Sequence, residues 1–126
     1  MKNMSNWFLR LAVLYLIIGV SLGLYMAASH DHSLYPLHAH VNLLGWVSLS
    51  LFGWFYRAFP AATETLLAKL HFAIIVPANL VQLVLLALLL RGNAAVEPAL
   101  AAASMLVGVA ILCFAVTVWK HTGQTA

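Results

Sequence analysis

The stretch from His30 to Tyr56 reads HDHSLYPLHAHVNLLGWVSLSLFGWFY and joins a histidine-rich loop to a strongly apolar run. Four of the six histidines of the chain lie within its first eleven residues. Pro36 suits the first turn of a helix, because proline has no backbone N–H to leave unpaired there. Histidine is the commonest metal ligand, so this concentration at the start of an apolar helix predicts a metal or heme site.

The composition places this helix in a lipid bilayer. Of the 126 residues, 64% are hydrophobic and 7% are charged, whereas soluble domains carry about 25% charged residues. The mean hydropathy is +0.99. Such a length has room for four helices of about 20 residues each and little else. We therefore predict an all-α membrane protein, a single domain over residues 1–126, with four transmembrane helices at about 7–29, 37–59, 64–90 and 98–119.

The basic residues predict the orientation of these helices. With four spans, five basic residues lie on the side of the membrane that holds the N-terminus: Lys2, Arg10, Arg57, Lys69 and Lys120. Arg91 lies on the other side. The positive-inside rule then puts both termini in the cytoplasm of a bacterium and turns the histidine-rich loop of this inner-membrane protein toward the periplasm. The first apolar run is longer than that of a signal peptide, so we expect it to be retained. The few basic residues are scattered, which excludes a nucleic-acid-binding surface.

Helical phase separates two of the histidines. His38 and His40 are two residues apart, about 200° around a helix, so they cannot meet one ion while both are helical. His38 shares a face with Asn42 and Gly45 that is polar and small enough to turn inward. His40 is expected on an apolar wall, formed by Leu44, Val47, Leu51 and Trp54.

Two further histidines lie on the neighbouring spans. On the first span, His30 follows a stripe that contains Gly19, Gly23 and Met26, and the two glycines allow another helix to approach closely. On the third span, His71 lies inside the apolar run. An ionisable residue at membrane depth is a candidate functional residue. By helix rise, however, it should sit roughly 15 Å deeper in the membrane than His40.

The run His38-Ala-His40-Val-Asn42-Leu-Leu-Gly45-Trp46, followed by Gly53 and Tyr56, resembles the second transmembrane helix of heme–copper oxidase subunit I. The nitric-oxide-reductase and cbb3-type branches are the most similar, and the resemblance extends to small four-helix proteins grouped as cytochrome oxidase subunit I-like. In this family a histidine of that helix, followed by a polar residue, ligates the low-spin heme. The resemblance implies that His40 has this role here, with Asn42 after it. Subunit I has about a dozen helices and a His-His copper pair, so we do not expect this chain to be a complete oxidase.

Three functions remain open from the sequence. The first is a protein that binds heme b, similar to a b-type cytochrome, for electron transfer with a redox partner or for gas or heme handling. His40 would be one axial ligand, with His71, His30 or a histidine of a second copy in a homo-oligomer as the other, and His38 near the propionates. The second is a copper- or zinc-binding accessory protein whose ligands would be His30, His32, His38, His40 and Met26. The third is a structural subunit without a cofactor. No catalytic residues are predicted.

Overall fold

The computed structural model describes residues 3–123, and over that range helices joined by short loops make up the chain, with no strand. This confirms the all-α prediction. The elements are α1 (Met4–Ser29), α2 (Tyr35–His40), the π-helix η1 (Val41–Val47), α3 (Ser48–Ala58), the 3-10 helix η2 (Pro60–Glu64), α4 (Leu66–Leu90), the 3-10 helix η3 (Ala94–Val96) and α5 (Glu97–Thr122).

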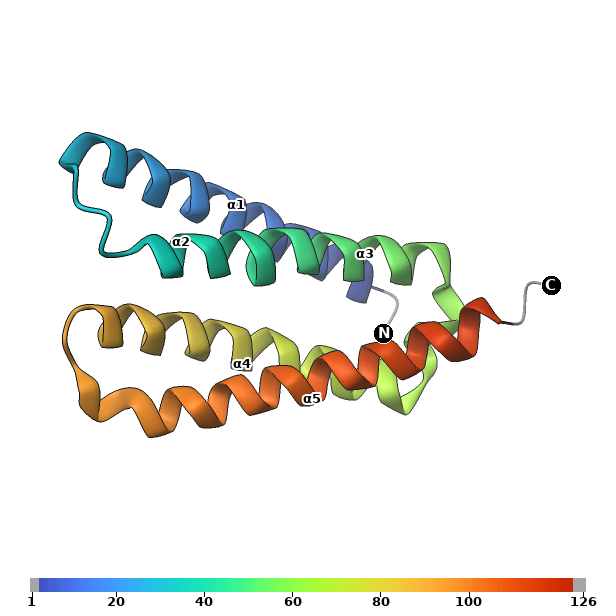
Figure 1. Ribbon diagram of the computed structural model, residues 1–126. Coiled ribbons are helices and arrows are strands. Elements are labelled where there is room, and N and C mark those ends of the chain that lie inside the picture. The colour runs from blue at the N-terminus through green and yellow to red at the C-terminus, as the bar shows by residue number, and fades with distance from the viewer. Residues whose placement is uncertain (1–2, 124–126) are drawn as a thin grey trace.

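These elements form two helical hairpins (Figure 1). The first pairs α1 with the continuous run of α2, η1 and α3, and the second pairs α4 with α5. The start of α1 and the end of α5 lie at the same end of the molecule, which we call the terminal end, together with η2. The loops that close the two hairpins, residues 30–34 and 91–93, lie at the opposite end, which we call the loop end.

Three segments of the described chain are long and apolar enough to cross a membrane, namely α1, α4 and Ala94–Thr122. They correspond to the predicted first, third and fourth spans. The predicted second span is divided among α2, η1 and α3, none of which alone has the length of a membrane-crossing helix. Composition and helix length therefore support a membrane protein.

The π-helix changes which side chains of the second span face inward. The buried positions of the second span recur every fourth residue around η1, at Leu37, Val41, Gly45 and Leu49, instead of every 3.6 residues. A π-helix has an i→i+5 bonding pattern, which rotates the residues that follow it relative to a regular α-helix. The Leu43 carbonyl accepts the Ser48 backbone N–H in this pattern and also a hydrogen bond from Ser48 Oγ at 2.7 Å.

The apolar wall predicted beside His40 lies partly on the outer surface of the hairpin and stays a prediction. His40 and the neighbouring Leu44 are half-buried, whereas Leu51 and Trp54 are 61% and 60% exposed on the outside of the hairpin. The wall was predicted from a regular 3.6-residue period, and the seven residues of η1 do not follow that period.

Glycines allow the two arms of the first hairpin to pack closely. A Cβ atom at Gly19 would lie 2.6 Å from Asn42 Oδ1, and one at Gly23 would lie 3.1 Å from His38 Cε1. A Cβ at Gly45 would lie 2.7 Å from Cγ of Tyr15. The prediction that Gly19 and Gly23 admit a neighbouring helix is confirmed, and the second span is that helix.

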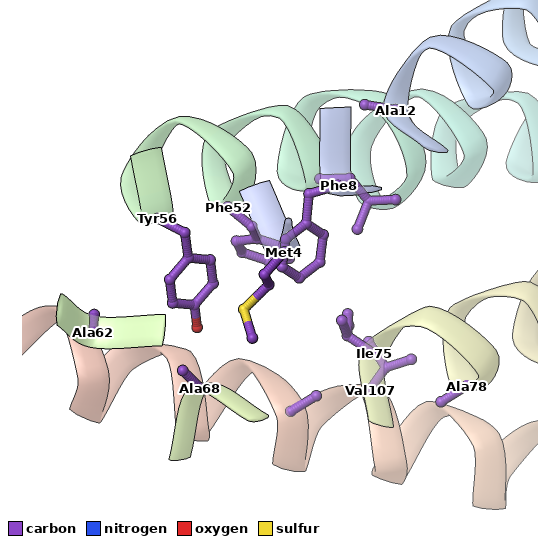
Figure 2. Close-up of a cluster of buried hydrophobic side chains, with 12 residues drawn as sticks. Met4, Phe8, Ala12, Phe52, Tyr56, Ala62, Ala68, Ile75, Ala78 and Val107 are labelled. Carbon is purple, nitrogen blue, oxygen red and sulfur yellow. The ribbon is translucent and has the colours of Figure 1, made fainter. Parts of the chain in front are cut away.

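Large side chains fill the space between the two hairpins near the terminal end. Figure 2 shows Met4 and Phe8 of α1 with Phe52 and Tyr56 of α3, all buried and directed toward the α4–α5 hairpin. Phe8 stacks on Tyr56 with ring centroids 5.8 Å apart and meets Phe52 edge-on at 5.6 Å. Aromatic side chains bury a large apolar area each and contribute strongly to the stability of a core. This cluster is therefore a main contact between the hairpins.

Candidate heme or metal site

His40 lies in the last turn of α2 and is half-buried. Its Nδ1 lies 2.7 Å from the Pro36 carbonyl oxygen. A carbonyl can only accept a hydrogen bond, so Nδ1 carries the proton and the neutral ring keeps its lone pair on Nε2. A histidine held in this way by a backbone carbonyl is oriented as a metal ligand is.

His38 points in another direction, against α1. Its Nδ1 lies 2.9 Å from the Gly19 carbonyl, which again fixes the proton on Nδ1. Asn42 Nδ2 donates to the His38 carbonyl at 2.8 Å, and its 3.4 Å approach to His38 Nδ1 is then a contact between two donors. The helical-phase prediction that His38 turns into the hairpin together with Asn42 agrees with these contacts.

The loop histidines are exposed to solvent. His30 ends α1 in the left-handed conformation with φ 57°, and His32 Nδ1 lies 3.3 Å from its carbonyl oxygen. Asp31 accepts a hydrogen bond from the Ser33 backbone N–H at 2.9 Å, and this bond lowers the pKa of its carboxyl group. Met26 is 5% exposed and packs in an apolar cluster with Leu34 and other residues of the loop end.

The four outer histidines do not form a ligand set in this structure. Within residues 3–123, no three histidine, cysteine, aspartate or glutamate side chains are grouped closely enough to hold a metal ion. His38 lies against α1, His40 hydrogen-bonds to its own helix, and His30 is exposed at the end of α1. The copper or zinc site therefore stays a prediction.

His71 is fully buried among the aromatic side chains that lie near the terminal end of the molecule. Its Nδ1 is 2.9 Å from the Tyr56 hydroxyl. Its ring lies 4.6 Å from that of Phe52, 5.1 Å from that of Phe114 and 5.4 Å from that of Phe8. Its Nε2 has no hydrogen-bond partner in the described part of the chain.

The contact between His71 and Tyr56 separates His71 from His40. Tyr56 follows His40 by 16 positions of continuous helix, which places them roughly 24 Å apart along the hairpin at about 1.5 Å per residue. One iron cannot bridge that distance. The two histidines of one chain therefore do not meet at one iron in this structure, and the identity of the second axial ligand stays a prediction.

Two amide side chains are buried on α4, and one of them, Asn79, joins the hairpins at mid-length. Asn79 Nδ2 donates to the Leu44 carbonyl of η1 at 3.2 Å. Its Oδ1, like Oε1 of Gln82, has no partner among residues 3–123. Leu44 lies inside the π-helix, so this bond ties the π-helix of the first hairpin to α4 of the second.

The Tyr56–His71 pair was missed by sequence reasoning, although its two residues were each expected on an inward face or at membrane depth. Their hydrogen bond depends on how the second hairpin packs against the first, which no local pattern encodes. Trp54, predicted beside the heme, instead lies exposed under Arg57, whose guanidinium carbon is 5.8 Å from the ring centroid.

Comparison with protein-family models, curated proteins and solved structures finds no match to this chain. The resemblance to heme–copper oxidase subunit I therefore rests on the motif of the second span alone. The class that the described residues define is coarser: an all-helical protein of two hairpins with membrane-spanning helices.

Proposed function

We propose that the chain crosses the bacterial inner membrane four times, with both termini in the cytoplasm. Besides the three long helices, the run from Tyr35 to Ala58 contains 24 helical residues, enough to cross the hydrocarbon core. The antiparallel order of the two hairpins agrees with four crossings (Figure 1). The charge distribution supports the orientation, since Arg57 and Lys69 flank η2 while Arg91 is at the loop end.

The orientation predicts which introduced cysteines react from outside the cell. In a Cys113→Ala background, Ser33→Cys should be labelled by a membrane-impermeant maleimide in intact spheroplasts, because residue 33 is exposed at the loop end. Asn3→Cys, exposed at the terminal end, should react only after the membrane is permeabilised. Labelling in the reverse order would contradict the proposed orientation.

We further propose that the protein binds heme b through Nε2 of His40. The observation that carries this proposal is the 2.7 Å hydrogen bond from His40 Nδ1 to the Pro36 carbonyl, which leaves Nε2 unprotonated and fixes the ring plane. Apolar side chains near His40 on the outside of the hairpin, Leu43 at 61% exposure among them, suit the face of a porphyrin. A bound heme supplies one-electron redox chemistry or gas binding.

The half-exposed position of His40 also bears on the second axial ligand. His71 is too far away, and His30 lies beyond the end of α1 in the exposed loop. A second copy of the chain could present its own His40 to the same heme across a twofold axis, because such an interface brings the same residue from each subunit together. We therefore include a homodimer with one heme for two chains in the proposal.

His40→Ala should abolish the heme absorption of the purified protein, because it removes the ligand nitrogen. His121→Ala is a matched control: His121 makes the same bond from Nδ1 to a carbonyl four residues earlier, at 2.8 Å to Thr117, but at the terminal end. It should leave the Soret band unchanged. The spectra of both variants, expressed with ample heme, check this. Equal loss in both, or a retained band in His40→Ala, would argue against His40 as the ligand.

Copper or zinc binding is the second candidate. One feature of the outer histidines favours it. His38 and His40 each donate a hydrogen bond from Nδ1 to a backbone carbonyl, so each keeps a lone pair on Nε2 for a metal. Elemental analysis of the protein that was used for the spectra separates the two candidates. Stoichiometric copper or zinc with no heme would replace the heme proposal by this one.

A further inference from the structure

A groove of about 580 Å³ runs along the first half of α1, near the terminal end. It is lined by Trp7, Leu9, Arg10, Val13 and Leu14. Residues three or four apart stand above one another on a helix. Trp7, Arg10 and Leu14 therefore form one ridge and Leu9 and Val13 another, so the groove is an apolar channel between two ridges with a single charge beside it.

Arg10 is the charge of this groove. It follows Met4 by six residues, so it lies about 9 Å along a helix that carries no other charge. Its side chain is exposed, and its guanidinium carbon lies 5.4 Å from the centroid of the Trp7 ring. No carboxylate in residues 3–123 forms an ion pair with it. An arginine at this depth is expected to reach for the headgroup layer, where phosphate is the anion.

A second arginine–tryptophan pair lies on the adjacent helix at a similar level. Leu9 packs on Gly53, where an added Cβ would lie 2.8 Å from Leu9 Cγ. One residue further along α3 is Trp54, with Arg57 above its ring. Tryptophan is enriched at membrane–water interfaces, so both pairs mark the headgroup level on this side of the first hairpin.

We propose that this groove binds an anionic phospholipid of the cytoplasmic leaflet. Its phosphate pairs with the Arg10 guanidinium, which matches phosphate in a bidentate fashion. The phosphate of a zwitterionic lipid is compensated by its own headgroup cation, so the net negative charge of the anionic lipid favours this contact. One acyl chain lies in the channel between Val13 and Leu14. Trp7 covers the glycerol region, since its ring is apolar and its N–H is polar. This lipid site is independent of the heme proposal.

Native mass spectrometry of the detergent-purified full chain tests the site, with phosphatidylglycerol and phosphatidylcholine as probes. For the wild type we expect tighter binding of phosphatidylglycerol, and for Arg10→Gln a loss of about fivefold in that affinity with phosphatidylcholine unchanged. Arg91→Gln, which removes an exposed arginine at the loop end, is the matched control and should change neither affinity.

A wild-type measurement accompanies the variants, so that a poorly folding variant does not decide the result. Raising the ionic strength should weaken phosphatidylglycerol binding and leave phosphatidylcholine binding unaffected, because salt screens only the charged contact. Equal affinity for the two lipids would overturn the proposal. So would an equal loss in Arg10→Gln and Arg91→Gln.

Discussion

Gly45→Ala should lower the free energy of unfolding by about 1–3 kcal/mol. The new methyl group would lie 2.7 Å from Cγ and 2.8 Å from Cβ of Tyr15. Because Cβ is fixed to the backbone of α1, the clash cannot be relieved by a rotation of the tyrosine ring alone. The π-helix and α1 must move apart, which also loosens the neighbouring contacts of His38 and Asn42 with the glycines of α1.

Gly108→Ala on α5 is the matched control, since nothing lies within 4 Å of the position that its Cβ would take. Alanine has a higher helix propensity than glycine, so this change should raise stability by about 0.5–1 kcal/mol. Unfolding of both variants in mixed micelles, followed by circular dichroism, gives the comparison. If Gly45→Ala were as stable as Gly108→Ala, the close packing of α1 on η1 would be contradicted.

His71→Ala should have the second large effect, a loss of about 2–5 kcal/mol in the free energy of unfolding. The substitution leaves a cavity among Phe8, Phe52 and Phe114 and removes the hydrogen bond between His71 and the buried Tyr56 hydroxyl. The lost hydrogen bond adds to the cost of the cavity. Because His71 lies far from His40, the variant should keep its heme absorption.

A double-mutant cycle separates the hydrogen bond from the cavity. Tyr56→Phe alone should cost about 1 kcal/mol, because it breaks the 2.9 Å bond to His71. In the His71→Ala background the same change should cost nothing, since the bond is already absent. Additive effects of the two substitutions would show that Tyr56 and His71 do not interact. Retained stability in His71→Ala would contradict the packed aromatic cluster.

The sequence predicts the helical spans of this chain because each depends on a local property. Long apolar runs such as 66–90 must bury their backbone groups as helices in a bilayer, and loops interrupt them at polar residues. The different directions of His38 and His40 also follow locally, from two residues of helical rotation. Close approach at Gly19 and Gly23 is predicted by the absence of a side chain.

What the sequence does not predict depends on longer-range contacts. Side chains of Ser48 and Asn79 donate to carbonyls of the π-helix, and Asn79 belongs to the other hairpin. Without that partner, a regular 3.6-residue period is the reasonable expectation for the second span, and the seven residues of η1 depart from it. The Tyr56–His71 bond likewise joins two hairpins. The nearness of the four histidines in the sequence also suggested one cluster. In the structure, different backbone carbonyls orient His38 and His40 in different directions, so the cluster does not form.

The most direct test of the proposed function is the absorption spectrum of the detergent-purified wild-type protein, recorded oxidised and then reduced after expression with ample heme. Heme ligated by His40 predicts a Soret band that shifts on reduction, with a stoichiometry of one heme for two chains. A folded, helical protein without absorption in the Soret region in either state would contradict heme binding by this chain.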